Sequence, residues 1–93
     1  GLNWMELMAC KIFFGGFPEE ISYEAAHRYF TKAIQYRTNS ILFLYGLASS
    51  LHKLGENEKA IQTLTKALAL PPAEPDDLLR KTRCETLLKE ITE

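Results

Sequence analysis

Residues 41–72, ILFLYGLASSLHKLGENEKAIQTLTKALALPP, carry the main signal for the fold of this chain. Apolar residues recur at helical spacing on both sides of Gly55, which is expected to end a first helix in the left-handed conformation that glycine adopts at little cost. A second helix then begins at residues 56–57, and the pair Pro71–Pro72 stops it near Leu70. The segment is therefore predicted to form an antiparallel helical hairpin.

An internal repeat with a period of 34 residues connects this hairpin to the segment before it. At that offset Ala26 falls on Ala60 and Phe30 falls on Leu64, and five positions are identical. The identical pairs are Glu24 with Glu58, Ala26 with Ala60, Thr31 with Thr65, Lys32 with Lys66, and Ala33 with Ala67. A fixed period of this length is typical of stacked helical repeats, in which small residues such as alanine allow two helices to cross closely. We therefore expect a stack of similar hairpins.

Two helices are expected ahead of residues 41–72. The first covers the apolar segment Leu2–Phe14, and the second is capped by Ser22 and runs to about Arg37. Residues 15–21 form the longer connection between them. This pair is predicted to be a second hairpin of the same kind.

One further helix is expected after Pro75. It runs through Asp76–Asp77 to Thr92, with its acidic residues placed to suit the helix dipole. Its apolar stripe consists of Cys84, Leu87, Leu88 and Ile91. Leu78 and Leu79 lie off that stripe. This leaves two alternatives: the helix begins with an irregular turn, or it contacts two neighbouring helices. The helix is predicted to cap the stack.

Residues 41–72 resemble one complete tetratricopeptide repeat. The signature positions hold Leu44, Leu47, Ala48, Leu51, Gly55, Ala60, Leu64, Ala67 and Pro72. The sequence departs from the pattern where Leu44 replaces the usual Trp and Leu64 the usual Phe or Tyr, and both changes keep the core apolar. The resemblance implies an all-α fold of antiparallel hairpins, with about five helices stacked as a right-handed superhelix. It divides a single domain, 1–93, into a first hairpin (1–38), a complete repeat (39–72) and a C-terminal capping helix (73–93).

Composition narrows the classes of function. Apolar residues make up 46% and charged residues 25% of 93 residues, as in soluble globular proteins. A net charge of −1 argues against nucleic acid as a partner. No apolar run reaches the roughly 20 residues that a membrane span needs, and the first residues do not have the layout of a signal peptide. We expect a cytoplasmic protein, and we interpret the chain as part of a longer one.

Residues capable of catalysis or metal binding are few and scattered. His27, His52, Cys10 and Cys84 form no recognised catalytic or metal-binding spacing. The basic group Arg80, Lys81 and Arg83 is interpreted as a solvated helix face. The sequence therefore predicts no enzyme activity, no catalytic residue, no metal site and no cofactor.

A concave surface is the candidate binding site that the tetratricopeptide resemblance implies. In such stacks the first helix of each pair lines this surface through its second, fifth, ninth and twelfth positions. Here those positions are Leu42, Tyr45, Ser49 and His52, and the same count on the earlier helix includes Glu6 and Cys10. Tyr45 is expected to make the main contact, because tyrosine combines a rigid apolar face with a hydrogen-bonding tip. The alternative is that Tyr45 only fills space between neighbouring helices.

The chain as a whole also resembles the C-terminal repeats of the regulator of microtubule dynamics family. The resemblance rests on Asn3–Trp4, the loop Gly16–Pro18, the segment Tyr29–Ala33 and the ending Ala67–Pro72. In animals that family is associated with microtubules and with mitochondrial or membrane-contact functions, so the resemblance implies a role of this kind.

Three functional hypotheses follow. The first is an interaction scaffold that binds a peptide or protein segment on the concave face. The second is binding of a lipid or another apolar small molecule between the helices, suggested by the aromatic and methionine-rich first hairpin. The third is self-assembly into a homodimer through exposed repeat ends, because burying even a few apolar side chains there gives about 1.5–3 kcal/mol each.

Overall fold

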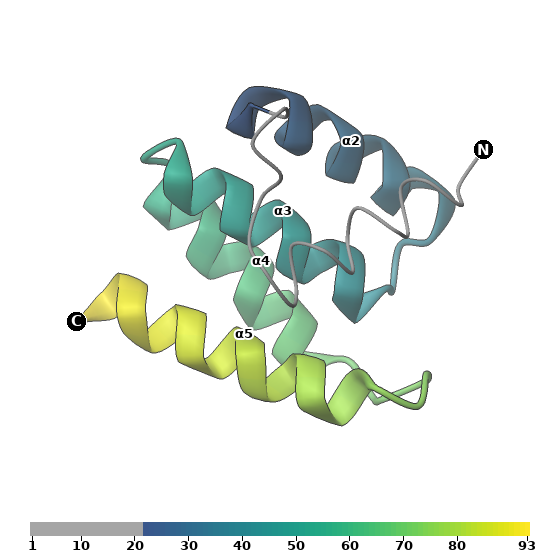
Figure 1. Cartoon of the computed structure of the whole chain (residues 1–93). Coiled ribbons are helices and arrows are strands. Elements are labelled where there is room, and N and C mark those ends of the chain that lie inside the picture. The colour runs from purple at the N-terminus through teal and green to yellow at the C-terminus, as the bar shows by residue number, and fades with distance from the viewer. Residues whose placement is uncertain (1–21) are drawn as a thin grey trace.

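The computed structural model describes residues 22–93, and all regular structure in this part of the chain is helical (Figure 1). The helices are α2 (Tyr23–Tyr36), α3 (Ile41–Lys53), α4 (Asn57–Ala69) and α5 (Asp77–Thr92). The all-α prediction and the four expected helices within residues 22–93 are confirmed. The helix expected over residues 2–14 and the connection at 15–21 lie outside the described residues.

Two serines fix the starts of α2 and α3. The Ser22 hydroxyl accepts a hydrogen bond from the Ala25 N–H at 3.1 Å, as predicted for an N-cap. The Ser40 hydroxyl accepts one from the Phe43 N–H at 3.2 Å. Each bond satisfies a donor that the first turn of a helix leaves without a partner.

Gly55 follows the end of α3, the first helix of the hairpin formed by residues 41–72, and adopts the predicted left-handed conformation with φ of +80°. The Gly55 N–H donates to the His52 carbonyl at 3.0 Å, and the Glu56 N–H donates to the Leu51 carbonyl at 2.8 Å. These two bonds form a Schellman motif, which reverses the chain within a few residues. The turn brings α4 back along α3.

Helix α3 lies at the centre of the described structure. It packs against α2 on one side and against α4 and α5 on the other, whereas α2 contacts neither α4 nor α5. Figure 1 shows α2, α3 and α4 as successive antiparallel neighbours, with α5 running alongside α3 in the same direction. This arrangement agrees with stacked hairpins, and the right-handed superhelix remains a prediction.

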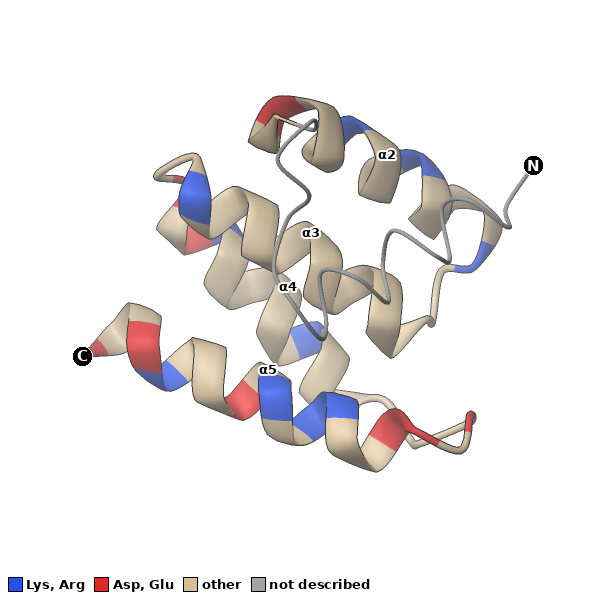
Figure 2. Cartoon of the chain, viewed as in Figure 1, with Lys and Arg blue, Asp and Glu red and all other residues tan. Residues whose placement is uncertain are grey.

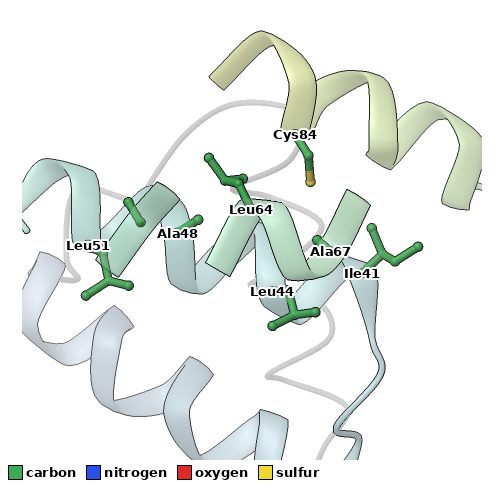
Figure 3. Packing of buried hydrophobic residues seen from close by; sticks show 8 residues of the cluster. Ile41, Leu44, Ala48, Leu51, Leu64, Ala67 and Cys84 are labelled. Carbon is green, nitrogen blue, oxygen red and sulfur yellow. The ribbon is translucent and has the colours of Figure 1, made fainter. Parts of the chain in front are cut away.

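The 34-residue repeat reappears in the burial of the helices. Ala26, Phe30 and Ala33 are the buried residues of α2, and those of α4 are Ala60, Leu64 and Ala67, each 34 positions later. The α2 residues form a cluster with Leu42 and Phe43 of α3. A second cluster joins α3, α4 and α5 (Figure 3), and its buried members are Ile41, Leu44, Ala48, Leu51, Ala60, Leu64, Ala67 and Cys84.

Helix α5 covers this second cluster with the predicted stripe. Cys84 is fully buried, and Leu87, Leu88 and Ile91 pack against the cluster while staying partly exposed. Leu78 and Leu79 are 68% and 48% exposed, so they face solvent.

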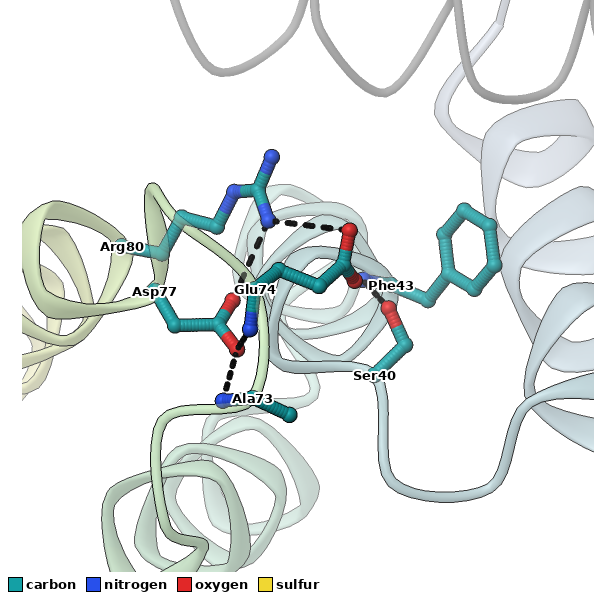
Figure 4. Close-up of polar contacts among 6 residues, drawn as sticks. All are labelled: Ser40, Phe43, Ala73, Glu74, Asp77 and Arg80. Atoms are coloured by element: carbon teal, nitrogen blue, oxygen red, sulfur yellow. Dashed lines mark hydrogen bonds and ion pairs between the residues drawn. The ribbon is translucent and has the colours of Figure 1, made fainter.

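The interpretation of residues 80–83 as a solvated face is wrong at Arg80. Its side chain is only 11% exposed, and its guanidinium lies 3.1 Å from the Asp77 carboxylate and 3.7 Å from that of Glu74 (Figure 4). Arg80 points inward because Asp77, one turn earlier, is itself buried. Only Lys81 and Arg83 are left of the expected basic face.

Candidate partner-binding site

Three of the predicted binding residues share one side of α3. Tyr45, Ser49 and His52 follow one another at intervals of four and three residues, which is the spacing of one helix face. All three are partly exposed. We call this trio the α3 face.

Tyr45 has a structural role as well as an accessible part. Its side chain packs against both core clusters, so the space-filling alternative describes part of what it does. Tyr45 nonetheless stays partly exposed, on the same helix face as the polar side chains of Ser49 and His52. Such a side chain loses little conformational freedom when a partner covers it.

The polar members of the α3 face have defined orientations. The Ser49 hydroxyl donates to the Tyr45 carbonyl at 2.9 Å, which leaves its oxygen available to accept a bond from a partner. The His52 Nδ1 lies 2.9 Å from Asn57 Oδ1, within hydrogen-bond distance. The His52 Nε2 lies 3.9 Å from Glu90 Oε2, a contact that is an ion pair only while the ring is protonated. His52 therefore connects the end of α3 to α4 and α5.

The other predicted contacts are not brought together with this trio. Leu42 is only 7% exposed and belongs to the cluster with Ala26 and Phe30, so its side chain is used in packing against α2. Contact between Leu42 and a partner remains a prediction. The burial of Leu42 does not favour it. Glu6 and Cys10 lie outside the described residues.

A polar cluster at the start of α5 was not predicted from the sequence. Asp77 Oδ2 accepts hydrogen bonds from the backbone N–H groups of Ala73 and Glu74, both at 2.8 Å, and Oδ1 accepts one from Arg80 at 3.1 Å (Figure 4). Burial acts to raise the pKa of Asp77, but the two backbone hydrogen bonds and Arg80 outweigh it and lower that pKa below 3.8. The signal for this cluster in the sequence is an acidic residue three positions before an arginine, directly after a proline-rich loop. The cluster fixes the loop rather than presenting a reactive group.

The chemistry of the described residues does not include an activated nucleophile. Burial, with a contribution from Glu85, raises the pKa of the Cys84 thiol to about 12, so Cys84 is protonated and inert at neutral pH. In residues 22–93 no three His, Cys, Asp or Glu side chains are placed to hold a metal ion. Over the same range, no helix has the length and apolar character needed to cross a bilayer.

Comparison with known protein families places this arrangement in context. The model of the family described as Regulator of microtubule dynamics protein 1-3 matches residues 1–92. Neither a curated protein nor a solved structure matches the chain.

Proposed function

The chain belongs to the regulator of microtubule dynamics family, and we propose that it is a protein-interaction module in microtubule regulation that binds a peptide or protein segment through the α3 face. The observation that carries this proposal is the position of Tyr45, Ser49 and His52. They lie partly exposed on the one helix that packs against all three other described helices.

The α3 face suits a binding role because its framework is fixed before a partner arrives. Neighbouring helices hold α3 on both sides, and each of the three side chains has a packing contact or a hydrogen bond that orients it. A surface of this kind pays little ordering entropy on association. Tyrosine is also enriched among the residues that dominate interface energies.

We assign the hairpins to the tetratricopeptide type as part of the same proposal. The assignment is supported by the buried alanines and their apolar partners, which recur after 34 residues in α2 and α4. It implies a right-handed superhelix whose first helices line the binding side. A non-enzymatic role and a cytoplasmic location are part of the same proposal.

Co-sedimentation with microtubules tests the proposal. The double variant Tyr45→Ala/Ser49→Ala is compared with a control, Leu78→Ala/Thr82→Ala, on the exposed side of α5. We expect the α3 variant to bind at least about thirtyfold more weakly, as for loss of an interface hot spot, and the control to bind like the wild type. Circular dichroism establishes that both variants are folded.

Two results would contradict different parts of the proposal. If the folded α3 variant sediments like the wild type, the α3 face is not the contact surface. If the wild-type protein itself does not sediment with microtubules or with purified tubulin, the microtubule role is wrong.

A further inference from the structure

A second surface lies on the outer side of α2. Arg28, Lys32 and Tyr36 follow one another at intervals of four residues, so they form one row along the helix. All three are exposed, and Tyr36 is 75% exposed, the largest value among the large hydrophobic side chains of residues 22–93. We call these three residues the α2 row. It lies away from the side of α2 that packs on α3.

Two of the three residues in the α2 row, Arg28 and Lys32, are positively charged. Within residues 22–93, Arg28 and Lys32 form no ion pair or hydrogen bond through their side chains. The sequence has no Asp or Glu between Glu24 and Glu56. Figure 2 shows the basic positions of α2 after the single acidic one in its first turn. The α2 row therefore presents two exposed positive charges on a chain whose net charge is −1.

We propose that the α2 row binds a short acidic protein segment in an extended conformation. Positions four residues apart on a helix are separated by about 6 Å along its axis. Alternate residues of an extended chain lie about 6.6 Å apart and point to the same side. A segment with the order acidic, any, acidic, any, apolar therefore places two carboxylates over Arg28 and Lys32 and its apolar residue over Tyr36.

The neighbouring residues favour one binding direction and one class of partner. The two carboxylates pair with Arg28 and Lys32, so the apolar end of the segment lies at Tyr36, and Glu24, one turn before Arg28, repels any further acidic residue beyond that end. Two cations beside an acid are few for a phosphate backbone, whose binding strengthens with the number of charges neutralised. Two carboxylates of a protein segment match the two cations, Arg28 and Lys32, in number.

This surface is separate from the α3 face, and its test uses a different ligand. The probe is a fluorescein-labelled peptide containing Glu-Ser-Glu-Ser-Leu, measured by fluorescence anisotropy with the whole chain at low and at moderate salt. We expect binding that weakens with salt and that falls at least about tenfold in Arg28→Glu/Lys32→Glu. Arg28→Gln/Lys32→Gln should fall less, and Tyr36→Ala should also weaken binding.

The matched control is Lys53→Glu/Lys66→Glu, which changes the net charge equally at two other exposed lysines. Lys66 is the counterpart of Lys32 one repeat later. Equal losses in both charge-reversal variants would overturn the proposal, because the effect would then be one of net charge. Equal binding of a Glu-Glu-Ser-Ser-Leu peptide would overturn the spacing argument.

Two further measurements distinguish the proposed peptide binding at the α2 row from nucleic-acid binding and from peptide binding at the α3 face. Tighter binding of a single-stranded oligonucleotide than of the peptide would make the α2 row a nucleic-acid surface and refute the acidic-segment proposal. Tyr45→Ala/Ser49→Ala should bind the peptide like the wild type. If it loses peptide binding while Arg28→Glu/Lys32→Glu retains it, the α2 row is not the site and the α3 face is.

Discussion

Replacing Gly46 by alanine tests the packing of α2 against α3. A Cβ added at Gly46 would lie 2.4 Å from Phe30 Cζ and 2.5 Å from Cε1, well inside contact distance. The Phe30 ring is 2% exposed and packs near Phe43 with ring centroids 6.5 Å apart, so it has little room to move. Gly46 therefore provides the space that the Phe30 ring occupies.

Two opposing effects set the size of the change. Alanine is favoured over glycine inside a helix by about 1 kcal/mol. Overpacking a filled core costs about 1–3 kcal/mol. We expect Gly46→Ala to lower the free energy of unfolding by about 1 kcal/mol, which is about 4–8 °C in Tm for a domain of this size.

Urea unfolding followed by circular dichroism measures this change, and a double-mutant cycle with Phe30→Leu identifies its cause. Leucine removes the ring atoms nearest Gly46, so Gly46→Ala should become stabilising by up to about 1 kcal/mol in the Phe30→Leu background. Gly55→Ala is the control, because nothing lies within 4 Å and its cost of about 1–2 kcal/mol comes from φ of +80° alone. That cost should be equal in both backgrounds. Equal destabilisation by Gly46→Ala in both backgrounds would refute the steric explanation.

Three other predictions concern single side chains. The Cys84 thiol, with its pKa raised to about 12, should resist a thiol reagent in a Cys10→Ser variant until the chain unfolds. Between about pH 9 and 12 the unfolded chain loses this proton and the native one keeps it, so stability should fall by up to about 1.4 kcal/mol per pH unit, and Cys84→Ala should lack that slope in urea titrations. Asp77→Asn should cost about 1–3 kcal/mol at neutral pH. Because the folded-state pKa of Asp77 is lowered, this difference from the wild type should be constant above about pH 4 and shrink below it; a gap unchanged down to pH 2 would contradict the assignment. Ser40→Ala should cost about 1 kcal/mol by thermal unfolding, as loss of the α3 N-cap, and no change in Tm would show that the Phe43 N–H finds another acceptor.

The helix pattern could be predicted because its signals are local. Ser22 accepts from the first turn of α2, Gly55 takes a positive φ, and Pro71 cannot extend α4, whatever the rest of the chain does. The burial of Ala26 and Ala60 at equivalent positions could be predicted because both stand at the same place in a repeated unit. Such features depend on backbone chemistry and on periodicity alone.

The polar contacts and the burial of individual side chains depend on residues that come into contact only in the folded structure. Arg80 is buried because Asp77 is buried beside it, and in sequence the same arginine looks like part of a basic helix face. Leu42 has the spacing of a groove residue, yet α2 approaches that side of α3 and covers it. Tyr45, Ser49 and His52 could be selected as one helix face from their spacing, whereas the identity of a partner could not be predicted, because no catalytic or ligand set marks the site.

The central position of α3 has a consequence for local unfolding. Among the described helices, α2 is attached through α3 alone, whereas α3, α4 and α5 all contact one another. Hydrogen exchange should therefore divide residues 22–93 into two cooperative units, with amides in α2 exchanging through a smaller opening than those in the three-helix unit. A protease that cleaves in residues 37–40 should consequently release α2 before it degrades the remainder.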